Sequence, residues 1–224
     1  MKDSARFARA VRKVARSLKS AAVWNGTKEA VDGCADDYVF EMLCYFKSAQ
    51  IAKKAYRLSI AGKTEKDSKG RLLAIWPKKP GYKANFSYFN LSDETTGNVA
   101  FQLCPGIRIA DIHGKDRAPD VNLLSGSAPI SPTHVDLKAC WDAKYCSDPT
   151  KRMPDTMVSD FIHTFRQLGS PAMSKDWKQA AEKSVFSMSG LITNGDASTE
   201  PDQTLAKNGI SETSGYPGNP TTRP

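Results

Sequence analysis

The sequence predicts an α/β fold with a mixed central β-sheet flanked by helices. Residues 38–58 and 155–168 have the apolar spacing of helices. Between them lie short apolar runs, rich in aromatic and β-branched residues and separated by Gly, Pro and Asn. Such runs are typical of strands joined by turns. A series of strands enclosed by helices indicates a sheet covered by helical layers.

The first predicted helix covers residues 4–22. Phe7, Val11, Val14 and Leu18 recur there at the spacing of one helical face. Lysines and arginines outnumber the single acid in the first twenty residues, so more than half of the net charge of +8 lies there. We expect a helix that docks by its apolar stripe and has some contact with nucleic acid. A membrane-surface helix and an organelle transit peptide are the alternatives.

The helix predicted over residues 38–58 has Asp36 or Asp37 as its possible N-cap. Glu41 lies inside its dense apolar surface, near the N-terminal end, where the helix dipole also favours an acid. Strand segments at residues 72–76, 86–91 and 98–103 follow, and they predict an antiparallel meander. A further helix over 155–168, a short helix over 177–183 and a strand over 184–193 complete the predicted core.

The central stretch consists of two predicted strands, residues 120–124 and 134–141, joined by a loop of Ser, Gly and Pro. Residues two apart in a strand point to the same side, so Asp136 and Lys138 share one face while their apolar neighbours face the core. Asp120 heads the adjacent strand. Two converging carboxylates repel each other unless a cation lies between them. Mg²⁺ suits such a site, because it binds one or two carboxylates and retains several waters.

Pro119-Asp120, followed after fifteen residues by Asp136-Leu137-Lys138, resembles the motif of the PD-(D/E)XK nuclease superfamily. This resemblance implies a restriction-endonuclease-like core and an Mg²⁺-dependent deoxyribonuclease, with endonuclease activity as the expected mode. By the same resemblance Asp120 and Asp136 bind Mg²⁺, which Mn²⁺ can replace, and the carbonyl of Leu137 faces the metal. Lys138 positions or helps to deprotonate the attacking water, and Glu41 supports the metal site.

Two arginines are candidates for contact with nucleic acid. Arg117 lies three residues before Asp120, and its planar guanidinium suits a phosphate. It could equally form a salt bridge with Asp116 or Asp120. Arg166 lies on the helix that follows the second strand, where the resembled family can place basic contacts. An ordinary exposed arginine is the alternative there.

The resemblance covers roughly residues 36 to 195. We therefore expect a basic N-terminal helix over 1–24, a nuclease-like domain over 25–195 and a disordered tail over 196–224, because the tail is poor in apolar residues. DNA is the expected partner rather than RNA, which suits the net charge of +8. A homodimer is also possible for this family. The alternative function is a catalytically silent nucleic-acid-binding or assembly subunit on a nuclease-like scaffold.

Composition excludes several other classes of protein. The five cysteines are an odd number without a CxxC pair, which argues against a disulfide framework and a zinc site. No apolar run approaches the length of about 20 residues that a membrane helix needs. No apolar segment of a secretory signal stands at the N-terminus. A cytoplasmic protein with reduced thiols is the expectation.

Overall fold

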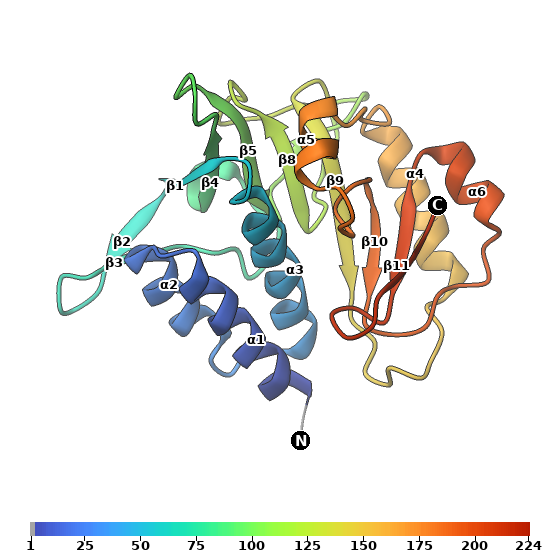
Figure 1. Ribbon diagram of the computed structural model, residues 1–224, viewed down its shortest axis with the longest axis horizontal. Coiled ribbons are helices and arrows are strands. Elements are labelled where there is room, and N and C mark those ends of the chain that lie inside the picture. Colours follow the sequence, from blue (N-terminus) through green and yellow to red (C-terminus); the bar gives the residue numbers. More distant parts are fainter. Residues whose placement is uncertain (1–2) are drawn as a thin grey trace.

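The computed structural model describes residues 3–224 of the chain, so Met1 and Lys2 lie outside the described residues. Figure 1 shows the helices and strands along the chain. The helices are α1 (Asp3–Ser17), α2 (Ala21–Val31), α3 (Asp36–Ala52), the 3₁₀ turn η1 (Lys83–Asn85), α4 (Asp155–Gln167), α5 (Lys175–Ala180) and α6 (Asp202–Asn208). The strands are β1 (Arg57–Gly62), β2 (Thr64–Lys66), β3 (Leu72–Ala74), β4 (Ser87–Ser92), β5 (Val99–Pro105), β6 (Ile109–Ala110), β7 (Asp116–Arg117), β8 (Val121–Ser125), β9 (Leu137–Lys144), β10 (Gly190–Thr193), β11 (Ser211–Ser214) and β12 (Thr221–Arg223).

Eight of the strands form one mixed sheet in the order β1-β4-β5-β8-β9-β10-β11-β12. Neighbours from β1 to β9 pair antiparallel, β10 runs parallel to both β9 and β11, and β12 closes the sheet antiparallel to β11. The parallel pairs require crossovers, which α4 with α5 and then α6 supply. The predicted α/β class with a mixed central sheet and flanking helices is therefore confirmed.

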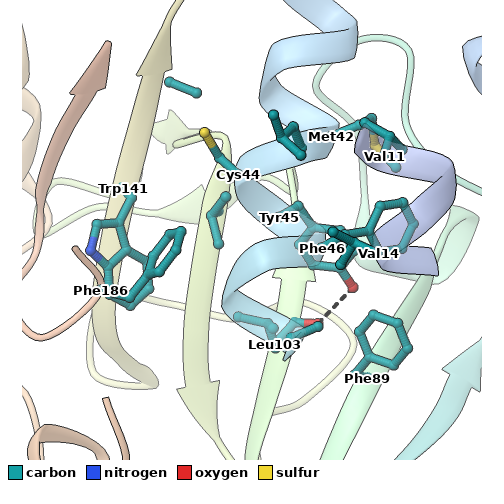
Figure 2. Close-up of a cluster of buried hydrophobic side chains, with 14 of the residues drawn as sticks. Val11, Val14, Met42, Cys44, Tyr45, Phe46, Phe89, Leu103, Trp141 and Phe186 are labelled. Atoms are coloured by element: carbon teal, nitrogen blue, oxygen red, sulfur yellow. Dashed lines mark hydrogen bonds between the residues drawn. The ribbon is translucent and has the colours of Figure 1, made fainter. Parts of the chain in front are cut away.

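Two apolar cores cover the two faces of the sheet. On one face, α3 packs against β5, β8 and β9, and α1 packs on α3. Figure 2 shows Tyr45 and Phe46 of α3 between α1 and the sheet, with the Tyr45 hydroxyl donating to the Leu103 carbonyl at 3.1 Å. On the other face, α4 and α6 bury residues such as Phe161 and Leu205. Strands β8 and β9 therefore lie in the middle of the sheet, between the two cores.

The helix predicted over residues 4–22 is divided in the structure. α1 ends at Ser17, and α2 begins at Ala21 with the Ser20 hydroxyl accepting from the Val23 amide. A serine N-cap starts a new helix because it satisfies an amide that has no partner within the helix. The predicted apolar stripe is nevertheless buried, at Phe7, Val11 and Val14 of α1 and at Leu18 just after its end. No helix within residues 3–224 has both the length and the apolar character to cross a membrane.

The disorder expected over residues 196–224 does not occur in the structure, which places α6, β11 and β12 there. Leu205 and Ile210 are fully buried in the core beneath α4. The carboxylate of Glu212 is also buried and receives Arg223 Nη2 at 2.6 Å. Composition misled the prediction, because these strands extend an existing sheet and share its core instead of building their own.

Candidate active site

Two carboxylates meet across β8 and β9. β8 and β9 are antiparallel with Val121 opposite Trp141, so Asp120 lies opposite Asp142. The Asp120 amide donates to Asp142 Oδ1 at 3.2 Å, and the Ala143 amide donates to Asp120 Oδ2 at 2.8 Å. Each carboxylate is therefore held by the backbone of the neighbouring strand, which fixes the pair in place.

Lys144 joins this pair from the same strand as Asp142. Residues alternate along β9, so Asp142 and Lys144 share one side while Trp141 and Ala143 are buried in the core. Lys144 Nζ lies 3.1 Å from Asp142 Oδ2. Burial alone would lower the pKa of Lys144, but Asp142 and Asp120 outweigh burial and raise it. Lys144 is therefore held as a cation beside two acids.

Glu41 reaches the site from the N-terminal part of α3. It lines a small cavity together with Asp120, Tyr38, Pro105 and other residues, and the cavity has a volume of about 30 Å³. A water needs roughly 10–15 Å³ of such space, so the cavity has room for a small ion or a water. The site is thus a narrow acidic recess at one edge of the α3–sheet contact.

The acids of the site repel one another. Burial, with Asp37 and Asp142 nearby, raises the pKa of Glu41 to about 7, although Lys144 opposes the shift. Burial, with Asp142 and Glu41, raises the pKa of Asp120 well above its usual range. Lys144 therefore does not fully offset the repulsion among these acids, and a bound cation would relieve what remains.

The structure does not bring Asp136, Leu137 and Lys138 to Asp120, so the predicted convergence of these residues is wrong. The Ser125 amide donates to the Asp136 carbonyl, which places Asp136 at the far end of β8 from Asp120. Five residues of strand separate the two ends, or about 16 Å. β9 begins three residues later than predicted, because residues 133–136 form a turn.

Asp136 and Lys138 of the predicted Asp136-Leu137-Lys138 triplet make contacts with residues that are close in sequence. Asp136 Oδ2 accepts from the amide and the hydroxyl of Thr133, at 2.9 and 3.3 Å. Lys138 Nζ donates to the Val135 carbonyl at 3.2 Å, and Val135 itself is exposed. These contacts shape the turn before β9 and leave no acid pair for a metal.

The two predicted phosphate-binding arginines lie apart from the acids. Arg117 Nε is 2.9 Å from Oδ2 of the buried Asp111, and this pair was not among the expected salt bridges. Burial would raise the pKa of Asp111, but the Lys115 amide and Arg117 bring it down to about 2. Arg166 Nε donates to Asn208 Oδ1 at 2.9 Å on the α4–α6 side. Contact with nucleic acid remains a prediction for both.

Asp142 and Lys144 are the residues of the candidate site that sequence reasoning missed. Their signal was present, because Trp141, Ala143 and Tyr145 alternate with Asp142 and Lys144 as in a continuing strand. Ending the strand at residue 141 hid a second acid-X-Lys triplet. Glu41 and Asp120 were named from the sequence and do lie together.

The Asp120 and Asp142 carboxylates fit Mg²⁺, although they do not form a larger cluster of metal ligands with the other described residues. Within residues 3–224, no group of three or more His, Cys, Asp or Glu side chains is arranged as a metal-binding cluster. Mg²⁺ often takes only one or two carboxylates and completes its shell with water. Asp120 and Asp142 meet that requirement, and Glu41 lines the recess beside Asp120.

Comparison of the chain with protein-family models, with curated proteins and with solved structures found no match.

Proposed function

We propose that this chain is a metal-dependent nuclease that hydrolyses phosphodiester bonds, in DNA rather than RNA, on a restriction-endonuclease-like core. The observation that carries the proposal is the set Asp120, Asp142 and Lys144 on two paired strands, with Glu41 on the helix beside them. Pro119-Asp120 followed by acid-X-Lys on the next strand resembles the PD-(D/E)XK motif, with Asp142-Ala143-Lys144 in place of the triplet expected from sequence.

Asp120 and Asp142 would hold Mg²⁺ or Mn²⁺, with the carbonyl of Ala143 taking the role first expected of Leu137. When bound, the ion supplies a more acidic water and polarises the phosphoryl oxygen. In the overall reaction a water oxygen bonds to phosphorus, the bond to the leaving oxygen breaks, and that oxygen takes a proton.

The chain's own residues contribute position and charge. Lys144 orients the attacking water and offsets negative charge that develops on the phosphate, because its ammonium is fixed 3.1 Å from Asp142. The backbone amides of Asp120 and Ala143 hold the carboxylates of Asp142 and Asp120 in fixed positions during the reaction. Glu41 lines the same recess as Asp120. In this proposal its carboxylate helps to orient water there.

The test is cleavage of supercoiled plasmid DNA by the full chain, with Mg²⁺ in one arm and EDTA in the other. We expect cleavage with Mg²⁺, none with EDTA, and a loss of at least about 100-fold in the variant Asp120→Asn. Binding of DNA without metal-dependent cleavage would favour the alternative, a silent nucleic-acid-binding or assembly subunit. That alternative is kept open by the absence of a third clustered ligand among the described residues.

A further inference from the structure

The exposed face of α1 carries a row of cations. Arg6, Arg9, Lys13 and Arg16 are three or four residues apart, so they lie along one side of the helix. All four are exposed. With a rise of 1.5 Å per residue, the row from Arg6 to Arg16 is about 15 Å long.

The opposite face of α1 belongs to the protein core. Phe7, Val11 and Val14 are almost fully buried, and they pack against α3. A helix that lies in a membrane surface must insert its apolar face among the lipids. α1 has already buried that face within its own chain, so its exposed side suits a polyanion and not a lipid bilayer.

Part of this charge is free of acidic partners within the protein. Among the side chains that the structure describes, Lys13 and Arg16 form no ion pair, whereas Arg12 pairs with Asp32 on α2. The Arg16 guanidinium lies over the Trp24 ring, 4.2 Å from its centroid, which holds it at the surface. These cations can therefore bind an external anion without breaking a salt bridge.

The row begins beside the candidate active site. The Phe7 ring lies 5.4 Å from Phe40, the residue before Glu41, and 6.0 Å from Tyr145, the residue after Lys144. At the other end of α1, the Ser17 hydroxyl accepts from Gln50 near the C-terminus of α3. α1 thus runs alongside α3, as Figure 1 shows, from the end of α3 that carries Glu41 toward its C-terminal end.

We propose that the exposed face of α1 binds the phosphate backbone of duplex DNA next to the site, an inference that rests on the proposed nuclease function. Duplex DNA carries one negative charge per about 1.7 Å of helix axis, so a row of cations about 15 Å long can meet several phosphates. Contacts of this kind fix the register of the duplex on the protein and do not read its sequence. The exposed face of α1 therefore binds DNA without sequence specificity. It supplies affinity for DNA that the acidic recess, which repels phosphates, cannot supply.

The experiment measures binding of the full chain to a short labelled DNA duplex in EDTA, over a series of salt concentrations. The variant Arg6→Gln/Lys13→Gln/Arg16→Gln removes three charges from the α1 face. The control Lys175→Gln/Lys178→Gln/Lys207→Gln removes three charges from exposed positions on α5 and α6. Both variants lose the same net charge, so a difference between them reports location. Circular dichroism confirms that both keep the helical content of the wild type.

We expect the α1 variant to bind at least about 10-fold more weakly near physiological salt, with a salt slope shallower by roughly 2 to 3. The control should stay close to the wild type. Equal weakening in the two variants, no weakening in the α1 variant, or no duplex binding by the wild type would each overturn the proposal. Mg²⁺-dependent cleavage measured on the same proteins separates the two ideas. Cleavage without α1-dependent binding rejects only this interface, whereas α1-dependent binding without cleavage rejects only the nuclease.

Discussion

The chain carries two acid-X-Lys triplets within nine residues, and they lie at opposite ends of the same strand. Asp136 and Lys138 stand at the start of β9, where each contacts its own turn. Asp142 and Lys144 stand at the end of β9, where Asp142 meets Asp120. The two triplets have the same chemistry and differ in neighbours. In an antiparallel pair, the head of one strand meets the end of the other, so only the later triplet reaches Asp120.

The largest difference between the triplets should appear when the lysines are exchanged for a neutral side chain of similar length. We expect Lys144→Met to lower the rate of plasmid cleavage by at least about 100-fold, because the site loses the ammonium that pairs with Asp142. Lys138→Met should change the rate by no more than about 2-fold, since it loses one contact with a loop carbonyl. Equal losses of cleavage rate in the two variants would show that the two triplets do not differ in function.

Metal binding separates the triplets without reference to activity. We expect Asp142→Asn to weaken the binding of Mn²⁺, measured by titration calorimetry without DNA, by about 10-fold or more. Asp136→Asn should leave the affinity unchanged, because its carboxylate lies at the far end of β8. Unaltered affinity in the Asp142 variant would mean that the ion, if bound, takes other ligands.

The acidic cluster should also make stability depend on pH. The raised pKa values of Glu41 and Asp120 mean that the native state holds more protons than the unfolded state between about pH 4.5 and 7. Stability of the metal-free protein should therefore fall as pH rises through this window. The variant Glu41→Gln should raise the melting temperature above pH 7 by a few degrees, since one charge of the cluster is gone.

The control for this prediction is the same comparison below about pH 4.5, where the unfolded carboxyl groups also take up protons. There Glu41→Gln and the wild type should melt at the same temperature in EDTA. A variant that melts lower than the wild type at high pH would show that the charge of Glu41 stabilises the fold, contrary to the repulsion described above.

The smallest expected effect concerns the turn before β9. Asp136→Ala removes the acceptor of the Thr133 amide and hydroxyl, at a cost of about 1 kcal/mol. In a chain of this size that loss lowers the melting temperature by about 2–4 °C. Cleavage at a temperature well below the melting point should be unchanged. If Asp136→Ala lost cleavage at that temperature, Asp136 would have to be part of the active site after all.

The sequence was sufficient for the α/β class, for the buried stripe of α1, and for singling out Glu41 and Asp120, which lie together in the structure. It was insufficient for the register of β8 on β9, because periodicity finds a strand but not the residue at which it starts. Val135 and Leu137 alternate as well as Ala143 and Tyr145 do, and the turn at Thr133 decides between them. The disorder predicted for residues 196–224 was wrong for a related reason, since β11 is held by pairing with β10 across the intervening helix α6, which local composition does not reveal.

The central claim is that the site uses the later triplet, and the most direct test is a side-by-side cleavage assay of Asp142→Asn and Asp136→Asn with saturating Mg²⁺. Both substitutions remove one charge and keep the side-chain shape. We predict a loss of at least about 100-fold for Asp142→Asn and a near-wild-type rate for Asp136→Asn. Retained cleavage in Asp142→Asn, or loss confined to Asp136→Asn, would contradict the account.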